Sequence, residues 1–190
     1  MYHIVIISGS ARMGRHTPKA ALALEERFNA HNKVDKVSVI DVKEYDFPVM
    51  AERLSRHPNP PDGLAECGAI LESADAIVIA SPEYNGSMSG ALKNTMDYFY
   101  KEYHRKPFGV AMVSGGKRGG INASHDIQKY ILTLGGYPMP YKLLIPDIRN
   151  TISEDGVLQE EWLHGAFDNF VRELLWLTEA IVTHKKKSRS

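Results

Sequence analysis

The sequence predicts a doubly wound α/β domain, and three features support this fold class. Short apolar runs rich in β-branched residues occur at 3–8, 37–40, 76–80 and 108–114, with a last short run at 141–145. These runs are almost continuously apolar, which is typical of strands covered on both faces of a parallel sheet. Segments with helical periodicity separate them, and a length of 190 residues suits one domain with a substantial core.

The segments between the strands carry apolar residues at three-to-four spacing, which predicts helices. The first segment places Ala20, Ala21, Leu24 and Phe28 within residues 18–31. The other expected helices span residues 63–74, 88–103, 121–134 and about 160–183. The resulting order is β-α-β-α-β-α-β-α-β-α, the alternation of a doubly wound fold.

Two segments are expected to be irregular. Residues 45–63 hold four of the ten prolines, so we expect a surface loop or flap there. Residues 185–190 form a basic run that is expected to be a disordered tail. The sequence therefore predicts a single domain over residues 1–184.

Composition limits the classes of partner. The 23 basic and 23 acidic residues give a formal net charge of zero, so no net field directs the chain toward nucleic acid or an anionic membrane. The single cysteine, Cys67, cannot form an internal disulfide, and its place on an apolar helix face predicts a core position. The eight histidines show no metal-ligand spacing, and the N-terminus lacks a signal-peptide pattern. We expect a cytoplasmic protein with no nucleic-acid or membrane partner.

The loop after the first strand, SGSARMGRHTP, has the groups that bind a phosphate. Ser10 and Thr17 supply hydroxyls, Arg12 and Arg15 supply guanidinium groups, and the start of the first helix supplies main-chain amides. The alternative is a plain Gly/Ser turn with surface arginines.

The loop after the third strand, SPEYNGSMSGALKN, presents main-chain groups in a rigid array. Pro82 fixes the backbone, Asn85-Gly86 is a strong turn former, and Tyr84 supplies a flat flank. A planar, polar heterocycle needs a hydrogen-bonding edge and an aromatic face of this kind. An Asx-type turn with a capping serine is the structural alternative.

The loop after the fourth strand, SGGKRGG at residues 114–120, has four glycines in seven positions. Such a main chain passes close to a ligand without side-chain collision, and Lys117 and Arg118 add positive charge. Ligands of open parallel sheets collect outside the carboxyl ends of the strands. The three loops are therefore expected to form one site.

Three motifs of the chain are GSARMGR, VIDVKEYDFPV and SPEYNGSMSGALKNTMDYF. Over roughly residues 1–145 they resemble the NAD(P)H-dependent FMN reductase family. The resemblance implies a flavodoxin-like three-layer sandwich, with a five-stranded parallel sheet of order 2-1-3-4-5 between helices. It also implies FMN-binding residues at the phosphate (Ser10, Arg12, Arg15, His16, Thr17), along the isoalloxazine (Pro82, Glu83, Tyr84, Asn85, Gly86) and at its other edge (Ser114, Gly115, Gly116).

The implied function is an FMN-dependent oxidoreductase. A hydride passes from NADPH or NADH through bound FMN to a small acceptor by a ping-pong mechanism, and FMN rather than a side chain carries the chemistry. The implied acceptors are quinones, free flavin, azo compounds or metal oxyanions, and a homodimer or homotetramer is expected.

Two alternatives remain at this stage. A flavodoxin-like electron carrier would bind FMN without a nicotinamide site, but such carriers tend to be strongly acidic and this chain is neutral. A nicotinamide-binding Rossmann protein without flavin is disfavoured because Ala11 replaces the second glycine of the fingerprint. A stripe of Met96, Phe99, Tyr100 and Tyr103 is expected in the core, with an interface as the other interpretation.

Overall fold

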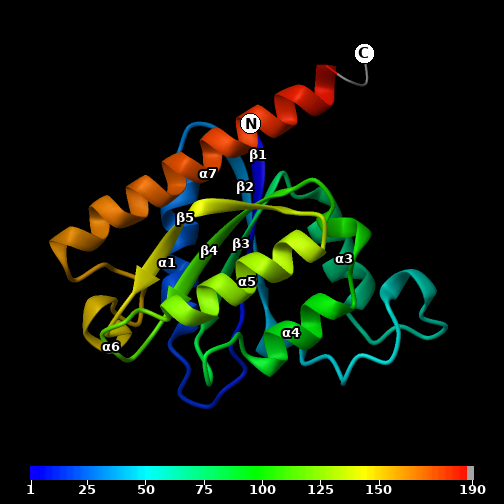
Figure 1. Ribbon diagram of the computed structural model, residues 1–190, viewed down its shortest axis with the longest axis horizontal. Coiled ribbons are helices and arrows are strands. Elements are labelled where there is room, and N and C mark those ends of the chain that lie inside the picture. The colour runs from blue at the N-terminus through cyan, green and yellow to red at the C-terminus, as the bar shows by residue number, and fades with distance from the viewer. Residues whose placement is uncertain (188–190) are drawn as a thin grey trace.

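Five parallel strands form the centre of the fold, in a computed structural model that describes residues 1–187 (Figure 1). They pair in the order β2-β1-β3-β4-β5, which confirms the predicted flavodoxin-like sheet. The strands are β1 (Tyr2–Ser8), β2 (Val34–Asp41), β3 (Ala76–Pro82), β4 (Pro107–Val113) and β5 (Tyr137–Ile145).

Helices cover both faces of this sheet (Figure 1). One face carries α1 (Thr17–Asn29) and α7 (Glu161–Lys187), and the other carries α3 (Leu64–Ser73), α4 (Gly90–Asp97) and α5 (Ile121–Thr133). The shorter elements are α2 (Val42–Tyr45), α6 (Ile148–Thr151) and two 3₁₀ turns, Leu54–Arg56 and Lys101–Tyr103.

Alternate residues of each central strand enter opposite cores. Ile4 and Ile6 pack beneath α1 and α7, whereas Val5 and Ile7 pack beneath α3 and α4. Since both faces are dry, a central strand has no polar side, and its sequence reads as one continuous apolar run.

The two edge strands are longer than predicted. β2 begins at Val34 instead of residue 37, because its exposed edge accepts polar residues that interrupt the apolar run. β5 begins at Tyr137 instead of residue 141, and contains Pro138 and Pro140. Proline lacks the amide hydrogen of a ladder and is tolerated where a strand has a neighbour on one side only.

The prediction of a single helix over residues 88–103 is wrong, because this range holds α4 and a separate 3₁₀ turn. α4 ends at Asp97 because the carbonyl of Tyr98 accepts a hydrogen bond from the amide of Leu54, at 2.8 Å, instead of from a following helical turn. The apolar stripe nevertheless lies mostly in the core: Met96, Phe99 and Tyr103 are buried, and Tyr100 is 38% exposed. Cys67 is buried as predicted, and burial raises the pKa of its thiol to about 12.

The last helix, α7, is also longer than predicted. It continues to Lys187, and so includes the first three residues of the expected tail 185–190. Residues 188–190 lie outside the described part of the chain.

Close packing of α7 on the sheet depends on Gly109 in β4. A Cβ at this position would lie 2.5 Å from Cζ of the buried Phe170. We expect Gly109→Ala to lower the free energy of unfolding by about 1–3 kcal/mol, the usual cost of overpacking a core, as measured by urea denaturation. Gly90→Ala is the control, because its Cβ would meet no heavy atom within 4 Å. Equal stability of the two variants would contradict this role of Gly109.

Candidate functional site

A cavity of about 180 Å³ opens at the carboxyl edge of the sheet, where the three predicted loops meet. It is lined by ten of the thirteen predicted residues: Ser10, Arg12, Arg15, His16, Thr17, Pro82, Glu83, Tyr84, Ser114 and Gly115. Asn85, Gly86 and Gly116 are exposed and lie outside the lining. The loops are therefore brought together as the parallel topology predicts.

Three larger residues of the lining were not predicted from the sequence. Val113 ends β4, and Ile148 and Arg149 belong to α6 after β5. The segment that holds α6 has no glycine-rich or motif-like pattern. Its only signal is its place after the fifth strand, because that strand ends at the same edge of the sheet.

The first loop is held by its own side chains. The hydroxyl of Ser10 is buried and lies 3.1 Å from the hydroxyl oxygen of Tyr84. The guanidinium of Arg15 donates to the carbonyl of Ser10, at 2.8 Å, and forms an ion pair with Asp41 at the end of β2. The charge of Arg15 is thus already neutralised, and its contacts fix the loop against β2.

The second loop contains a two-residue hairpin. Tyr84 and Ser87 exchange both main-chain hydrogen bonds, at 2.9 and 3.1 Å. Asn85 and Gly86 between them have positive φ angles of 53° and 84°, as a type I′ turn requires. The predicted rigid main-chain edge is therefore present, with the tip of the hairpin exposed.

Glu83 links the second loop to the third. Its carboxylate accepts a hydrogen bond from the amide of Ala123, at 3.2 Å, in the first turn of α5. An anion at a helix N-terminus satisfies a free amide and interacts favourably with the helix dipole. The side chain of Glu83 thus has a structural partner beside the cavity.

The helix that follows the hairpin positions the segment after β2. The side-chain amide of Asn94 donates to the carbonyls of Phe47, at 3.2 Å, and Pro48, at 2.8 Å, and its oxygen accepts from the amide of Met50 at 2.8 Å. The hydroxyl of Tyr98 adds a bond to the Pro48 carbonyl at 3.0 Å. The start of the proline-rich segment is consequently bonded to α4, and residues 47–50 form part of a loop without regular secondary structure, with Pro48 and Val49 exposed.

His16, which precedes α1, is a partly buried titratable group of the cavity lining. Its Nδ1 is buried and has no hydrogen-bond partner. Burial lowers the pKa of this imidazole, and the nearby charges of Lys19 and Arg149 lower it further. A buried donor site among cations is suited to an anion.

Two further features of residues 1–187 concern metal ligands and membrane spans. Within that range, no cluster of three or more His, Cys, Asp or Glu side chains is placed to hold a metal ion. No helix of the same range is both long and apolar enough to cross a membrane.

Comparison with known proteins places these features in a family. The sequence profile of the NADPH-dependent FMN reductases matches residues 2–149, which include all three loops and Arg149. The chain belongs to the NADPH-dependent FMN reductase family. This confirms the predicted class of enzyme, an FMN-dependent NAD(P)H oxidoreductase, over the electron carrier and the flavin-free Rossmann protein.

Individual relatives agree with this assignment. The chain is 26% identical over 159 residues to an NADPH azoreductase of Bacillus sp. strain OY1-2, covering 83% of each sequence. It is 29% identical over 139 residues to a quinone reductase of Pseudomonas putida strain KT2440, covering 70% of this chain and 72% of that protein. The fold also matches FerB, a flavoenzyme NAD(P)H:acceptor oxidoreductase of Paracoccus denitrificans, with a TM-score of 0.73 and 22% identity over 92% of this chain and 97% of that one.

The three bonds of Asn94 give a testable measure of how strongly α4 holds the segment after β2. Asn94→Ala removes all three and leaves two carbonyls and an amide without that partner. We expect the free energy of unfolding to fall by about 1–3 kcal/mol, measured by urea denaturation. Asn32→Ala, at an exposed position, should change it by less than about 0.5 kcal/mol. A neutral Asn94→Ala would show that these bonds contribute nothing to stability.

Proposed function

We propose that the cavity and its three loops bind FMN and that the enzyme reduces quinones or azo compounds with electrons from NADPH or NADH. The observation that carries this proposal is the convergence of a phosphate-type loop and a rigid main-chain hairpin on one cavity. The names of the relatives, a quinone reductase and an NADPH azoreductase, support the acceptor classes. Free flavin and metal oxyanions are the further acceptors that we propose to test.

The residues around the cavity fit FMN. At the phosphate end are the hydroxyls of Ser10 and Thr17, the guanidinium of Arg12 and the unpartnered Nδ1 of His16. A dianionic phosphate accepts hydrogen bonds from donors of this kind, and it supplies the partner that Nδ1 of His16 lacks within residues 1–187. The hairpin after Pro82 presents main-chain groups for the polar edge of a planar ring, and Gly115 leaves open space in the third loop.

Bound FMN supplies the redox chemistry, so the chain has to bind, orient and shield the reacting groups. This agrees with the engagement of Glu83, the acidic residue of the lining, in a structural contact with α5. In the proposed ping-pong cycle, reductant and acceptor use the same exposed side of the site in turn. The free thiol of Cys67 supports the further proposal that the enzyme works in the reducing cytoplasm.

Flavin binding tests the proposal directly. We expect the purified protein to bind FMN, and NADPH to bleach the flavin absorbance in the absence of oxygen. Arg12→Ala should weaken FMN binding by about 1.5–3 kcal/mol, the scale of a hydrogen bond to a charged group, with an unchanged melting temperature of the apoprotein. Arg56→Ala, at an exposed and remote arginine, is the control. A protein whose melting temperature does not respond to FMN would refute the proposed function.

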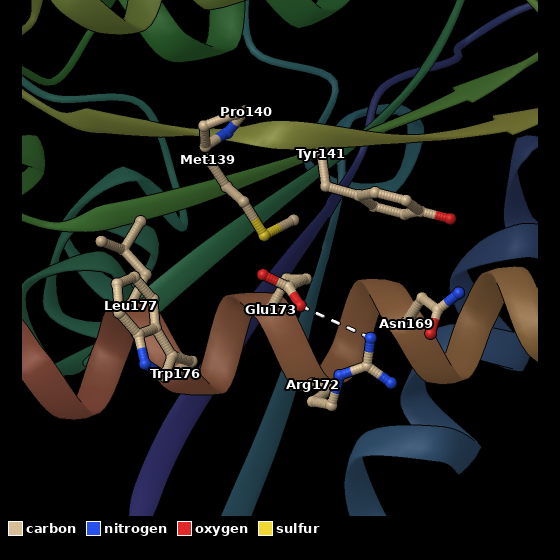
Figure 2. A pocket seen from close by; sticks show the side chains of 8 residues that line it. All are labelled: Met139, Pro140, Tyr141, Asn169, Arg172, Glu173, Trp176 and Leu177. Carbon is tan, nitrogen blue, oxygen red and sulfur yellow. Dashed lines mark hydrogen bonds and ion pairs between the residues drawn. The ribbon is translucent and has the colours of Figure 1, made fainter.

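We also propose that the chain assembles as a homodimer or homotetramer and that α7 and β5 form one contact surface. A groove of about 510 Å³ lies between these elements. Figure 2 shows the side chains that line it: Met139, Pro140, Tyr141, Asn169, Arg172, Glu173, Trp176 and Leu177. Trp176 is 68% exposed and Trp162, on the same helix, 50%. Exposed aromatic residues of this size are typical of interfaces.

The sequence of α7 is suited to pairing with a second copy of itself. Trp162, Asn169 and Trp176 recur at seven-residue intervals on one face of the helix. If two helices pair antiparallel about Asn169, the two tryptophans lie opposite each other. The same symmetry places the small Gly165 opposite Glu173 and Ala166 opposite Arg172, as an isologous contact requires. A Cβ on Gly165 would meet no heavy atom within 4 Å, so nothing in the described part of the chain requires a glycine there.

The assembly proposal is tested by mass in solution. Trp176→Glu places a charge at the proposed contact, and we expect the mass from light scattering to fall to that of a smaller species. Leu132→Glu, at a 61% exposed position on α5, should leave the mass unchanged. An unchanged mass in Trp176→Glu would refute α7 as a contact surface.

A further inference from the structure

Two arginines at the cavity have no acidic partner among residues 1–187. They are Arg12 in the first loop and Arg149 in α6, and both line the cavity. Arg15 and Lys19 nearby are engaged in the ion pairs Arg15–Asp41 and Lys19–Glu154, and the exposed Lys117 and Arg118 lie outside the cavity lining. Unlike Arg15 and Lys19, Arg12 and Arg149 present charge that no described side chain neutralises.

Main-chain bonds hold α6, and therefore Arg149, against the glycine-rich loop. The amide of Ile148 donates to the carbonyl of Ser114 at 3.0 Å, and the amide of Asp147 donates to that of Gly116 at 3.3 Å. The hydroxyl of Thr151 closes this short helix by donating to the carbonyl of Pro146 at 3.0 Å. The backbone of Arg149 is thus placed at the cavity by the fold itself and not by a ligand.

His16 lies at the same end of the cavity. It occupies the position before α1 without making a side-chain capping bond, and its buried Nδ1 has no partner. The charged groups that act on its imidazole come from three elements besides its own loop: Lys19 from α1, Arg149 from α6 and Glu154 from the segment after α6. Arg12 acts on it from within the loop.

We propose that Arg149 completes, with Arg12 and His16 of the first loop, a binding site for a phosphomonoester dianion. Arg149 supplies a second guanidinium, and His16 donates a hydrogen bond from Nδ1. The inference rests on the proposed function, because the two available phosphomonoesters are the terminal phosphate of FMN and the 2′-phosphate of NADPH. It adds to that function a recognition residue from the segment after β5, outside the three loops.

A dianion beside His16 favours the imidazolium, so its pKa rises on binding from the lowered value of the free protein. Binding therefore takes up a proton at pH values between the free and bound pKa. Affinity for the phosphomonoester should increase as pH falls through this interval and level off below the free pKa. The second ionisation of the phosphate itself, near pH 6, acts in the opposite direction and is equal in every variant.

The first arm of the test measures dissociation constants of FMN and riboflavin by quenching of flavin fluorescence, in a buffer without phosphate. Riboflavin lacks the phosphate and shares the ring. We expect Arg149→Ala to weaken FMN at least about tenfold, the effect of one charge-assisted hydrogen bond, and to leave riboflavin unchanged. Arg56→Ala should leave both unchanged.

The second arm identifies the source of the phosphate. If it is the 2′-phosphate of NADPH, Arg149→Ala leaves FMN affinity unchanged and raises KM for NADPH about tenfold, while KM for NADH stays the same. Either selective loss supports the phosphomonoester site. If the flavin dissociation constants and the KM values of Arg149→Ala all equal those of the wild type, the phosphomonoester site is overturned. The proposed function still stands in that case, because it depends on FMN binding by the wild-type protein. A wild-type protein that binds no flavin refutes the proposed function instead.

The third arm concerns His16 and compares wild type with His16→Asn, which keeps an N–H donor and removes the titration. Dissociation constants of the identified phosphomonoester are measured between about pH 6 and pH 8.5, across the range where histidine titrates. We expect the gain in affinity on acidification to be several-fold larger in the wild type. The same pH profile in both proteins would remove His16 from the site.

Discussion

The hydroxyl of Ser89 holds together the two loops on which the site is built. It is buried, donates to the carbonyl of Gly9 at 2.5 Å, and accepts the amide of Leu92 at 3.1 Å to begin α4. The loops approach so closely that a Cβ at Gly9 would lie 2.9 Å from Leu92 Cδ2 and 3.0 Å from the carbonyl oxygen of Ala80. The glycine is thus required by packing, and the start of α4 is fixed relative to the end of β1.

Hydrogen bonds between loops also fix the rest of the carboxyl edge of the sheet, where each loop is bonded to its neighbour. Tyr84 contacts Ser10 in the first loop, Glu83 binds the start of α5, and Ile148 binds Ser114. Parallel strand pairing brings the loops to one edge, and these contacts set their spacing. A site ordered before the ligand arrives loses little conformational entropy on binding, which suits a protein whose main task is to hold a cofactor.

The sequence predicted those parts of the molecule whose physical constraint is local. Dry central strands such as 76–80 give an uninterrupted apolar run, and Asn85-Gly86 encodes its own turn. The first residues of β2 and β5 could not be predicted, because an edge strand accepts polar residues and prolines that interrupt its apolar run. The end of α4 could not be predicted either, because a contact with the distant Leu54 causes it. Arg149 was not predicted because no local motif marks its segment, and only the position of that segment after β5 brings it to the cavity.

A neutral chain can carry a basic site because ion pairing is decided residue by residue. The formal net charge is zero, yet two arginines of the cavity lining, Arg12 and Arg149, form no ion pair with a carboxylate in the described part of the chain. Arg15, which the motif places beside Arg12, is bound to Asp41 and acts by holding the loop. Position in a motif thus identifies the loop, whereas the partners of each arginine decide which charge is left for an anion.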